Sequence, residues 1–163
     1  TGSGFDRGHL VASANQNEIN LQNSETFLLS NMSPQHPQFN RDIWRKLESA
    51  IRKLDAEEDI WETYVICGPI FYFDIPVQSI GTTDSNGVSI PIPNAYFKSI
   101  LTENKHGKLK MWSFLMNNME LEESIEKYLV STSKIEKLAG LKLWEKLVGS
   151  EINKEKKNKS KYN

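Results

Sequence analysis

Four consecutive residues, Asp6, Arg7, Gly8 and His9, combine an acid, a permanent cation, a position without a side chain and a base. An imidazole can take a proton from water near neutral pH, and a guanidinium can hold a phosphate through two parallel hydrogen bonds. Because Gly8 lacks a Cβ, the chain or a substrate can approach closely there. The stretch therefore indicates hydrolysis of a phosphoester. The alternative is a surface turn with an Asp–Arg ion pair and an ordinary histidine.

A second group of polar residues, Asn31, Asn40 and Glu48, lies in the segment SNMSPQHPQFNRDIWRKLE. An amide oxygen is a hard, neutral ligand, and magnesium accepts one or two protein oxygens while it keeps most of its waters. Asn40, at the start of a predicted helix, can supply that oxygen. Glu48 lies about 12 Å further along the helix axis, so it reaches the water shell of the ion or an arginine rather than the ion itself.

Structural roles for these three residues stay open at this level. Asn40 is also a good N-cap, Glu48 can form an ion pair with Arg45 or Arg52 on the helix surface, and Asn31 can brace a loop.

The composition is that of one folded domain. The chain has 163 residues, of which 38% are hydrophobic and 25% charged, and no apolar run reaches the roughly 18 residues that a membrane helix needs. The one cysteine, Cys67, excludes an internal disulfide and a cysteine-rich zinc site. It lies in the apolar run YVICGPIF, which favours a buried, unreactive thiol over a nucleophile.

The charge distribution says more than the net charge of −1, which is unusual for a non-specific nucleic-acid binder. Basic residues cluster within the otherwise acidic body of the chain, where they can steer a polyanion: Arg41, Arg45, Lys46, Arg52 and Lys53. We predict a single domain over residues 1–150. The lysine-rich residues 151–163 have few apolar side chains, and we predict a mobile tail there.

The apolar periodicity predicts a helix over residues 40–54, with Ile43, Leu47, Ile51 and Leu54 on one face and Asn40 as its N-cap. The remaining expectations are loops over 15–25 and 30–39, strands over 26–29, 61–73, 96–101 and 108–116, and helices in the last third, over 121–129, 133–140 and 141–148. Both faces of 61–73 are apolar, which predicts an interior strand.

Taken together, FDRGHLVASAN, TFLLSNMSPQ and FNRDIWRKLE, with the gaps between them, resemble the DNA/RNA non-specific endonucleases. These are the ββα-metal nucleases of the Serratia nuclease and mitochondrial endonuclease G type. Weaker similarities in VICGPIF, IPNAYFKSIL and IEKLAGL extend the resemblance from about residue 5 to about residue 148. It implies an α+β fold of the ββα-metal nuclease type, with a mostly antiparallel sheet and flanking helices.

The resemblance also implies a role for each residue of the two polar groups. His9 matches the general base, Arg7 the arginine that contacts phosphate, and Asn40 the direct ligand of a single magnesium ion, or of manganese in its place. Glu48 matches the glutamate that orients the ion's water shell, and Asn31 a supporting polar residue. The implied substrates are DNA and RNA, cut to 5′-phosphate and 3′-hydroxyl ends.

Charge alone, and not the resemblance, adds two candidates for contacts with the nucleic-acid backbone, Arg41 and Arg45.

The chain departs from the family pattern in two places. The motif usually continues with Ala-Pro and ends in Asp, whereas Val11-Ala12 and Asn15 stand here. Relatives also carry a segment before the motif that contributes strands. We therefore expect missing N-terminal strands, an exposed sheet edge, and either a separate N-terminal chain or a homodimer.

A free nuclease is harmful in cytoplasm, so we expect secretion or a periplasmic location. Two other functions stay open: a non-catalytic nucleic-acid-binding remnant, and a phosphodiesterase that acts on small nucleotides.

Overall fold

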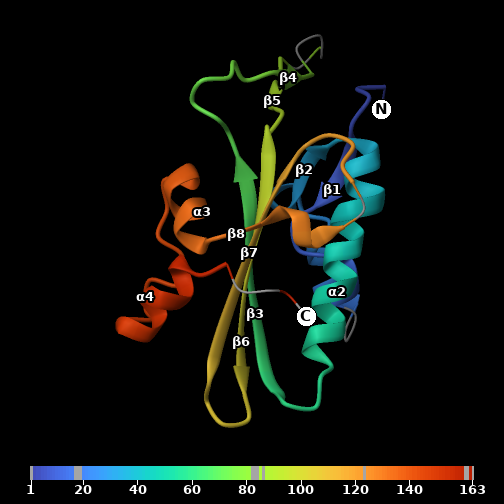
Figure 1. Cartoon of the computed structure of the whole chain (residues 1–163). Coiled ribbons are helices and arrows are strands. Elements are labelled where there is room, and N and C mark those ends of the chain that lie inside the picture. Colours follow the sequence, from blue (N-terminus) through green and yellow to red (C-terminus); the bar gives the residue numbers. More distant parts are fainter. Residues whose placement is uncertain are drawn as a thin grey trace.

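A computed structural model of the chain describes residues 2–16, 20–81, 85, 87–122, 124–159 and 162. The elements in chain order (Figure 1) are β1 (Asp6–His9), η1 (Ser13–Asn15), α1 (Asn20–Glu25), η2 (Leu29–Asn31), β2 (Met32–Gln35), η3 (Phe39–Trp44), α2 (Arg45–Asp55), β3 (Ile60–Ile70), β4 (Ser79–Ile80), β5 (Ile90–Pro91), β6 (Ala95–Asn104), β7 (Leu109–Asn117), η4 (Ile125–Tyr128), β8 (Leu129–Val130), α3 (Thr132–Ala139) and α4 (Ser150–Lys157). The mixed α+β class is confirmed. No helix in these described ranges is long and apolar enough to cross a bilayer.

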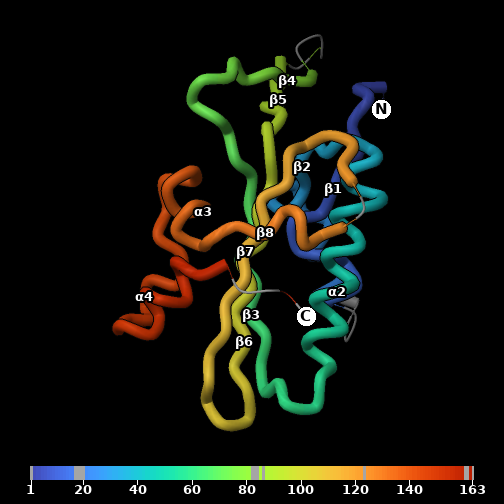
Figure 2. The backbone as a smooth tube through the Cα atoms, viewed as in Figure 1, coloured from blue at the N-terminus to red at the C-terminus, as the bar shows by residue number. Residues whose placement is uncertain are grey.

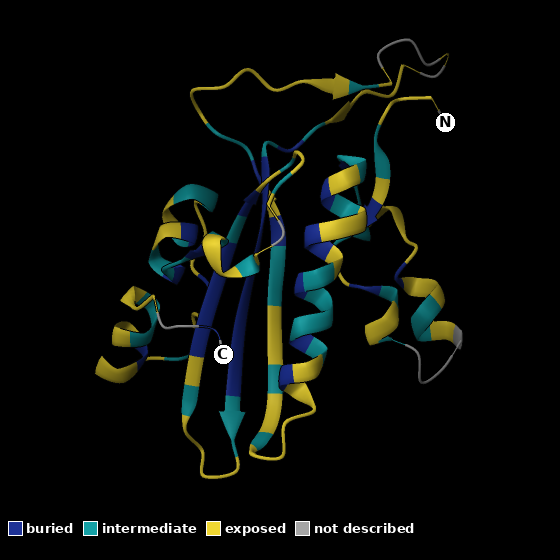
Figure 3. Ribbon diagram, turned by 45° about the vertical axis from the view of Figure 1, so that its right-hand side comes forward, coloured by how far each residue is buried: buried dark blue, intermediate teal, exposed yellow. Residues whose placement is uncertain are grey.

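The centre of the molecule is an antiparallel sheet with the strand order β3-β6-β7-β8. Strand β6 lies between β3 and β7, and its residues 95–102 are all buried (Figure 3). The strands predicted over 96–101 and 108–116 are confirmed as β6 and β7. The turn between them is closed by the Asn104 side chain, which accepts hydrogen bonds from the backbone N–H groups of His106 and Lys108.

Strand β3 differs from its prediction as an interior strand. Its one partner within the described residues is β6, so β3 is an edge strand. Trp61, Tyr64 and Val65 are exposed on it, with 69% of Trp61 accessible. An apolar pattern on both faces indicates that both faces can be buried, but the pattern cannot show whether a neighbouring strand is present. One edge of the sheet is therefore formed by β3.

Strands β1 and β2 form a separate antiparallel pair, in which Asp6 lies opposite Gln35 and His9 opposite Met32. Residues 30–39 were expected to be irregular because of Pro34 and Pro37, so this prediction is wrong for β2. Pro34 is tolerated because β2 pairs along one side only in the described structure, and a missing N–H group on the free side breaks no ladder bond.

Two other local predictions near the hairpin are wrong. Residues 26–29 form turns that lead into η2, not a strand, because local backbone bonds such as Asn31 N–H to the Leu28 carbonyl (2.9 Å) close this segment on itself. The segment 15–25 was expected to be a loop. It contains helix α1, while its residues 17–19 lie outside the described residues.

A continuous helical segment, η3 followed by α2, covers one face of the sheet. The predicted face is confirmed, since Ile43, Leu47, Ile51 and Leu54 are buried in one cluster with residues of β6 and β7. The N-cap prediction for Asn40 is wrong, because its N–H group bonds to the His36 carbonyl inside the helical segment (2.9 Å). Pro37 suits a first helical turn, and the helix therefore begins before Asn40.

The opposite face of the sheet carries α3, whose buried Ile135 packs in a second core cluster with Ile70 and Phe97. Gly140 ends α3 in the left-handed conformation (φ 65°), as its position predicts. The helix expected over 121–129 is instead η4 followed by β8, and residues 141–148 form turns. Helices therefore flank both faces of one sheet (Figure 1).

The lysine-rich end of the chain, where we predicted a mobile tail, contains a helix. Residues 150–157 form α4, in which Ile152 is buried and Lys156 forms an ion pair with Glu136 of α3 (2.8 Å). Tyr162 lies in the core cluster on the α2 side of the sheet, edge-on to Trp112 and Phe114. Figure 2 shows α3 and α4 on the other side of the sheet from α2.

Candidate active site

The strand β1 and the start of the helical segment meet at Asp6. Its carboxylate accepts hydrogen bonds from the side-chain amide of Asn40 (Nδ2–Oδ2, 3.0 Å) and from Arg41 (Nε–Oδ2, 2.8 Å; Nη2–Oδ1, 2.7 Å). The bonds from Arg41, above all, lower the pKa of Asp6. The Asp6 carboxylate thus holds the side-chain N–H group of Asn40. The amide oxygen of Asn40, which bonds to nothing in the described part of the chain, is the group left for a ligand.

Asn40 and Arg41 lie in a π-helical turn, η3, which spans Phe39–Trp44. Turns of this kind are rare, and they occur often at functional sites because the wider turn redirects side chains. The buried Phe39, Ile43 and Trp44 hold the turn against the core. The local geometry therefore turns Asn40 and Arg41 toward the hairpin.

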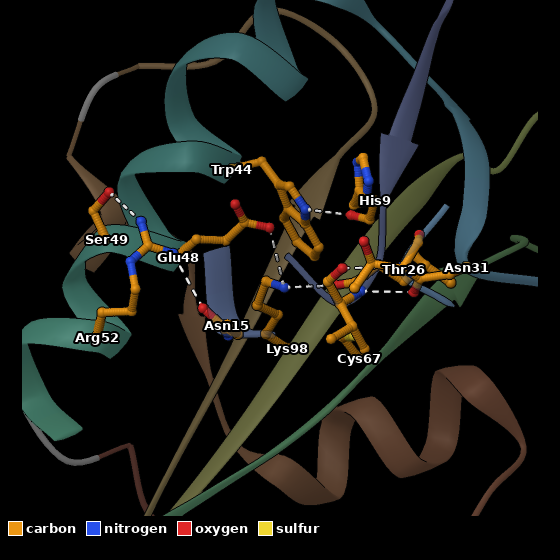
Figure 4. Close-up of polar contacts among 12 residues, drawn as sticks. His9, Asn15, Thr26, Asn31, Trp44, Glu48, Ser49, Arg52, Cys67 and Lys98 are labelled. Atoms are coloured by element: carbon orange, nitrogen blue, oxygen red, sulfur yellow. Dashed lines mark hydrogen bonds and ion pairs between the residues drawn. The ribbon is translucent and has the colours of Figure 1, made fainter. Parts of the chain in front are cut away.

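His9 is held through its backbone and its ring. The Trp44 indole N–H donates to the His9 carbonyl at 3.1 Å (Figure 4). The Phe27 ring meets the imidazole edge-on, at 4.7 Å between centroids. The Nε2 atom of His9 is buried and has no hydrogen-bond partner among the described residues. Burial lowers the pKa of His9, so the imidazole is neutral near pH 7 and able to accept a proton.

These contacts align the strand with the helix. Asp6, at the start of β1, contacts Asn40, while His9, at its end, contacts Trp44, which lies one helical turn after Asn40. One turn advances a helix by roughly 5 Å. The predicted base and the predicted metal ligand, far apart in sequence, therefore lie on neighbouring parts of one hairpin–helix unit.

Glu48 lies one further turn along the helix, with its side chain 14% exposed. Its carboxylate pairs with Lys98 at 3.7 Å. Burial raises the pKa of Glu48, and the charges of Lys98 and Arg52 oppose that rise. Glu48 is thus a partly buried carboxylate beside two cations. Its ion pair is with Lys98 from the sheet, whereas the alternative left open from the sequence was a surface pair with Arg45 or Arg52.

Asn31 acts as a brace for the segment that follows His9. Its amide oxygen accepts from the Val11 N–H (2.8 Å), and its amide N–H groups donate to the carbonyls of Val11 (2.9 Å) and Thr26 (2.8 Å) (Figure 4). Both ends of the side chain are used by backbone groups. Asn31 therefore ties the segment after His9 to the turn at Thr26.

The three candidate substrate arginines are placed differently. Arg7 is exposed, bonds to nothing within the described ranges, and shares a face of β1 with His9 because strand side chains alternate. Arg41 is exposed but committed to Asp6, and Arg45 donates one bond to the Arg41 carbonyl (2.8 Å). Only Arg7 is thus both free and beside the imidazole.

Gln35 was not among the site residues predicted from the sequence. It is fully buried, neither atom of its amide has a partner among the described residues, and its Oε1 lies 1.8 Å from where a Cβ on Gly8 would stand. Gly8 is therefore required by the Gln35 side chain. Only the strand pairing reveals this contact, since the 26 residues between Gly8 and Gln35 carry no signal of it.

The residues present fit a magnesium ion held by oxygen. The described chain contains no group of three or more His, Cys, Asp and Glu side chains that could hold a metal. What the helical segment offers is the free amide oxygen of Asn40, with the Glu48 carboxylate further along the same helix face. Such a sparse oxygen set suits an ion that keeps most of its waters.

A two-stranded hairpin is followed by a helix, with a histidine on the first strand and an asparagine near the helix start. This arrangement defines the class of ββα nucleases. The family model for DNA/RNA non-specific endonuclease matches residues 1–150, and the chain belongs to that family.

Similar proteins include mitochondrial Endonuclease G of Caenorhabditis elegans, 37% identical over 94% of this chain and 51% of the relative. Human mitochondrial Endonuclease G is 33% identical over 86% of this chain and 48% of the relative, and a nuclease of Serratia marcescens is 30% identical over 85% and 50%. The chain thus spans about half the length of these relatives.

A crystal structure described as the EndoG/EndoGI complex, on the mechanism of EndoG inhibition, superposes with a TM-score of 0.75 and 30% identity. The match covers 90% of this chain and 62% of that one.

Proposed function

We propose that the chain carries the catalytic site of a magnesium-dependent endonuclease that hydrolyses phosphodiester bonds of DNA and RNA. The observation that supports this most is the contact of Asp6 with the amide N–H of Asn40, which leaves the amide oxygen for an ion. The unpartnered His9 Nε2 lies on the same four-residue strand. Family membership supports the same reaction class.

In this proposal magnesium, when bound, neutralises charge on the phosphate and on the departing 3′ oxygen. His9 accepts the proton of the attacking water at Nε2, for which its lowered pKa keeps it neutral. Arg7 holds the phosphate from the same face of β1 and balances the charge that develops there. Glu48 orients waters around the ion.

The products in this proposal are those that the family resemblance implies. Water attacks the phosphorus opposite the 3′ oxygen, the P–O3′ bond breaks, and the departing oxygen takes up a proton from solvent water. The downstream fragment then carries the 5′-phosphate and the upstream fragment the 3′-hydroxyl. Contacts from Arg7 to phosphate carry no information on the base or the sugar, so DNA and RNA are both substrates.

The test is digestion of supercoiled plasmid and of RNA with magnesium, with manganese and with EDTA. Cleavage that needs the metal and leaves 5′-phosphate ends is expected, and Asn40→Ala should abolish it. Asn40→Asp should retain part of it, because a carboxylate oxygen replaces the amide oxygen. Magnesium binding measured calorimetrically is expected to be lost in Asn40→Ala. Binding of DNA without cleavage would contradict the proposal and favour a non-catalytic binder.

The activity must be kept away from the cell's own nucleic acid, and we propose secretion or a periplasmic location on this ground. Fractionation of the source cells, followed by detection with an antibody, tests this location. Association as a homodimer or with a separate chain is proposed from the exposed edge of β3, and light scattering of the purified protein tests it.

A further inference from the structure

Lys98 is a buried lysine, and its three contacts among the described residues all involve segments of the candidate active site. Only 3% of its side chain is exposed, on the central strand β6. Lysine is rarely buried, since removing an ammonium from water is unfavourable unless partners replace the water. The position of those partners is therefore informative.

The Lys98 ammonium donates to the Leu10 carbonyl at 2.9 Å and pairs with the Glu48 carboxylate at 3.7 Å. It also lies 4.2 Å from the centroid of the Trp44 ring (Figure 4). The three partners come from three segments: the residues after β1, helix α2, and η3. One cation therefore joins the hairpin, the helix and the sheet.

The contacts converge on the backbone of His9. Trp44, which lies under the ammonium, donates its indole N–H to the His9 carbonyl (3.1 Å), and Lys98 itself holds the next carbonyl, that of Leu10. The Cys67 thiol donates to the same Leu10 oxygen (3.1 Å). The backbone carbonyls of His9 and of the next residue are thus both held, one by the helical segment and the other by the sheet.

We infer that Lys98 is a positioning residue, which holds the backbone of His9 and the Glu48 carboxylate in their working geometry without contacting substrate. The inference rests on the proposed function for its kinetic consequence, though the geometry can be tested without it. Partners that orient the groups of a metal site typically change activity by about 10–100-fold when they are removed.

The test compares Lys98→Met with Lys110→Met in the full chain. Both replace an ammonium near a tryptophan ring by a side chain of similar length. Lys110 lies 5.9 Å from the Trp112 ring, and within the described residues it makes no contact with the candidate site. Lys98→Met is expected to lower kcat on plasmid DNA by about 10–100-fold with KM within about twofold. Lys110→Met should change neither value. Lys98→Arg, which keeps the charge but not its single-point geometry, should be intermediate.

A second measurement does not need activity. The ¹H–¹⁵N resonance of the Trp44 indole, assigned by Trp44→Phe, reports the bond to the His9 carbonyl. It is expected to shift in Lys98→Met and not in Lys110→Met. If the wild-type chain cleaves nothing, this shift still decides the positioning role, and the proposed function alone is rejected.

Three results would overturn the inference. One is a folded Lys98→Met with unchanged kcat. Another is a rise in KM at constant kcat, which would make Lys98 a substrate-binding residue. The third is an unmoved Trp44 resonance. If Lys98→Met does not fold, Lys98→Arg decides in its place, and wild-type kcat together with an unmoved resonance would reject the role.

Discussion

The hairpin–helix unit and the central sheet differ in how far their buried polar groups are satisfied. In the sheet, the Ser113 hydroxyl bonds to those of Ser99 and Thr132, and the Trp144 indole N–H donates to Ser99, each at 2.9 Å. Thr63 Oγ1 on β3 and Tyr162 Oη near the chain end are exceptions, since both are buried without a partner among the described residues. Four such atoms gather in the hairpin and the following helical turn: His9 Nε2, His36 Nδ1 and both amide atoms of Gln35.

This difference indicates which buried polar groups serve the fold and which are available to a ligand. A satisfied buried network rigidifies the fold, whereas an unsatisfied buried group destabilises it by about 1–3 kcal/mol. Proteins accept that loss mainly where a ligand, an ion or a water completes the bond. The contrast therefore supports the hairpin–helix unit as the place where ligands bind, and four changes test it.

The largest effect is expected for His9→Ala. Loss of the proton acceptor should lower kcat/KM on plasmid DNA by roughly 10²–10⁴-fold, while the melting temperature stays near that of the wild type. His106→Ala, on the exposed β6–β7 turn, is the matched control and should retain full activity. Equal activity of the two variants would remove His9 from the reaction.

Gln35→Leu separates stability from function most sharply. An apolar side chain of similar size removes two unpartnered amide atoms, so the free energy of unfolding should stay the same or rise. If the amide serves the site, the activity should fall about 10–100-fold. Urea denaturation and plasmid cleavage measure the two quantities. A clear loss of stability with full activity would show that Gln35 belongs to the structural network.

The reverse result is expected in the sheet for Ser113→Ala. This change leaves the hydroxyls of Ser99 and Thr132 without their common partner, and it should lower the free energy of unfolding by about 1–3 kcal/mol. Cleavage measured below the melting temperature should be unchanged. A fall in kcat would mean that the sheet and the site are coupled through β6.

The smallest expected effect is a shift in the pH dependence of kcat/KM. Because burial lowers the pKa of His9, the acidic limb of the kcat/KM profile should lie below the ordinary histidine value of 6.5. The same shift contributes stability that is complete above pH 6.5 and is lost as the pH falls toward the lowered pKa. A limb above pH 6.5 would contradict this environment for the base. His9→Ala should lose this pH-dependent part of the stability.

The amino-acid sequence by itself determined which candidate groups are present and where several local elements form. The stretch FDRGHL contains the groups to which we assign the reaction. The spacing of Ile43, Leu47, Ile51 and Leu54 gives the buried face of the helix that follows. The apolar strands on either side of residues 104–107 were predicted correctly. Such features depend on neighbours within a few positions, so local propensity and periodicity report them.

Only the tertiary structure decided which polar groups meet. The pairing of Asp6 with Arg41 instead of Arg7, the contact of Gln35 with Gly8 and the burial of Lys98 beneath the hairpin join segments tens of residues apart. It also decided that Pro34 lies in a strand and that β3 lies at an edge. A sequence lists possible partners, but long-range packing selects among them because many arrangements satisfy the same local pattern.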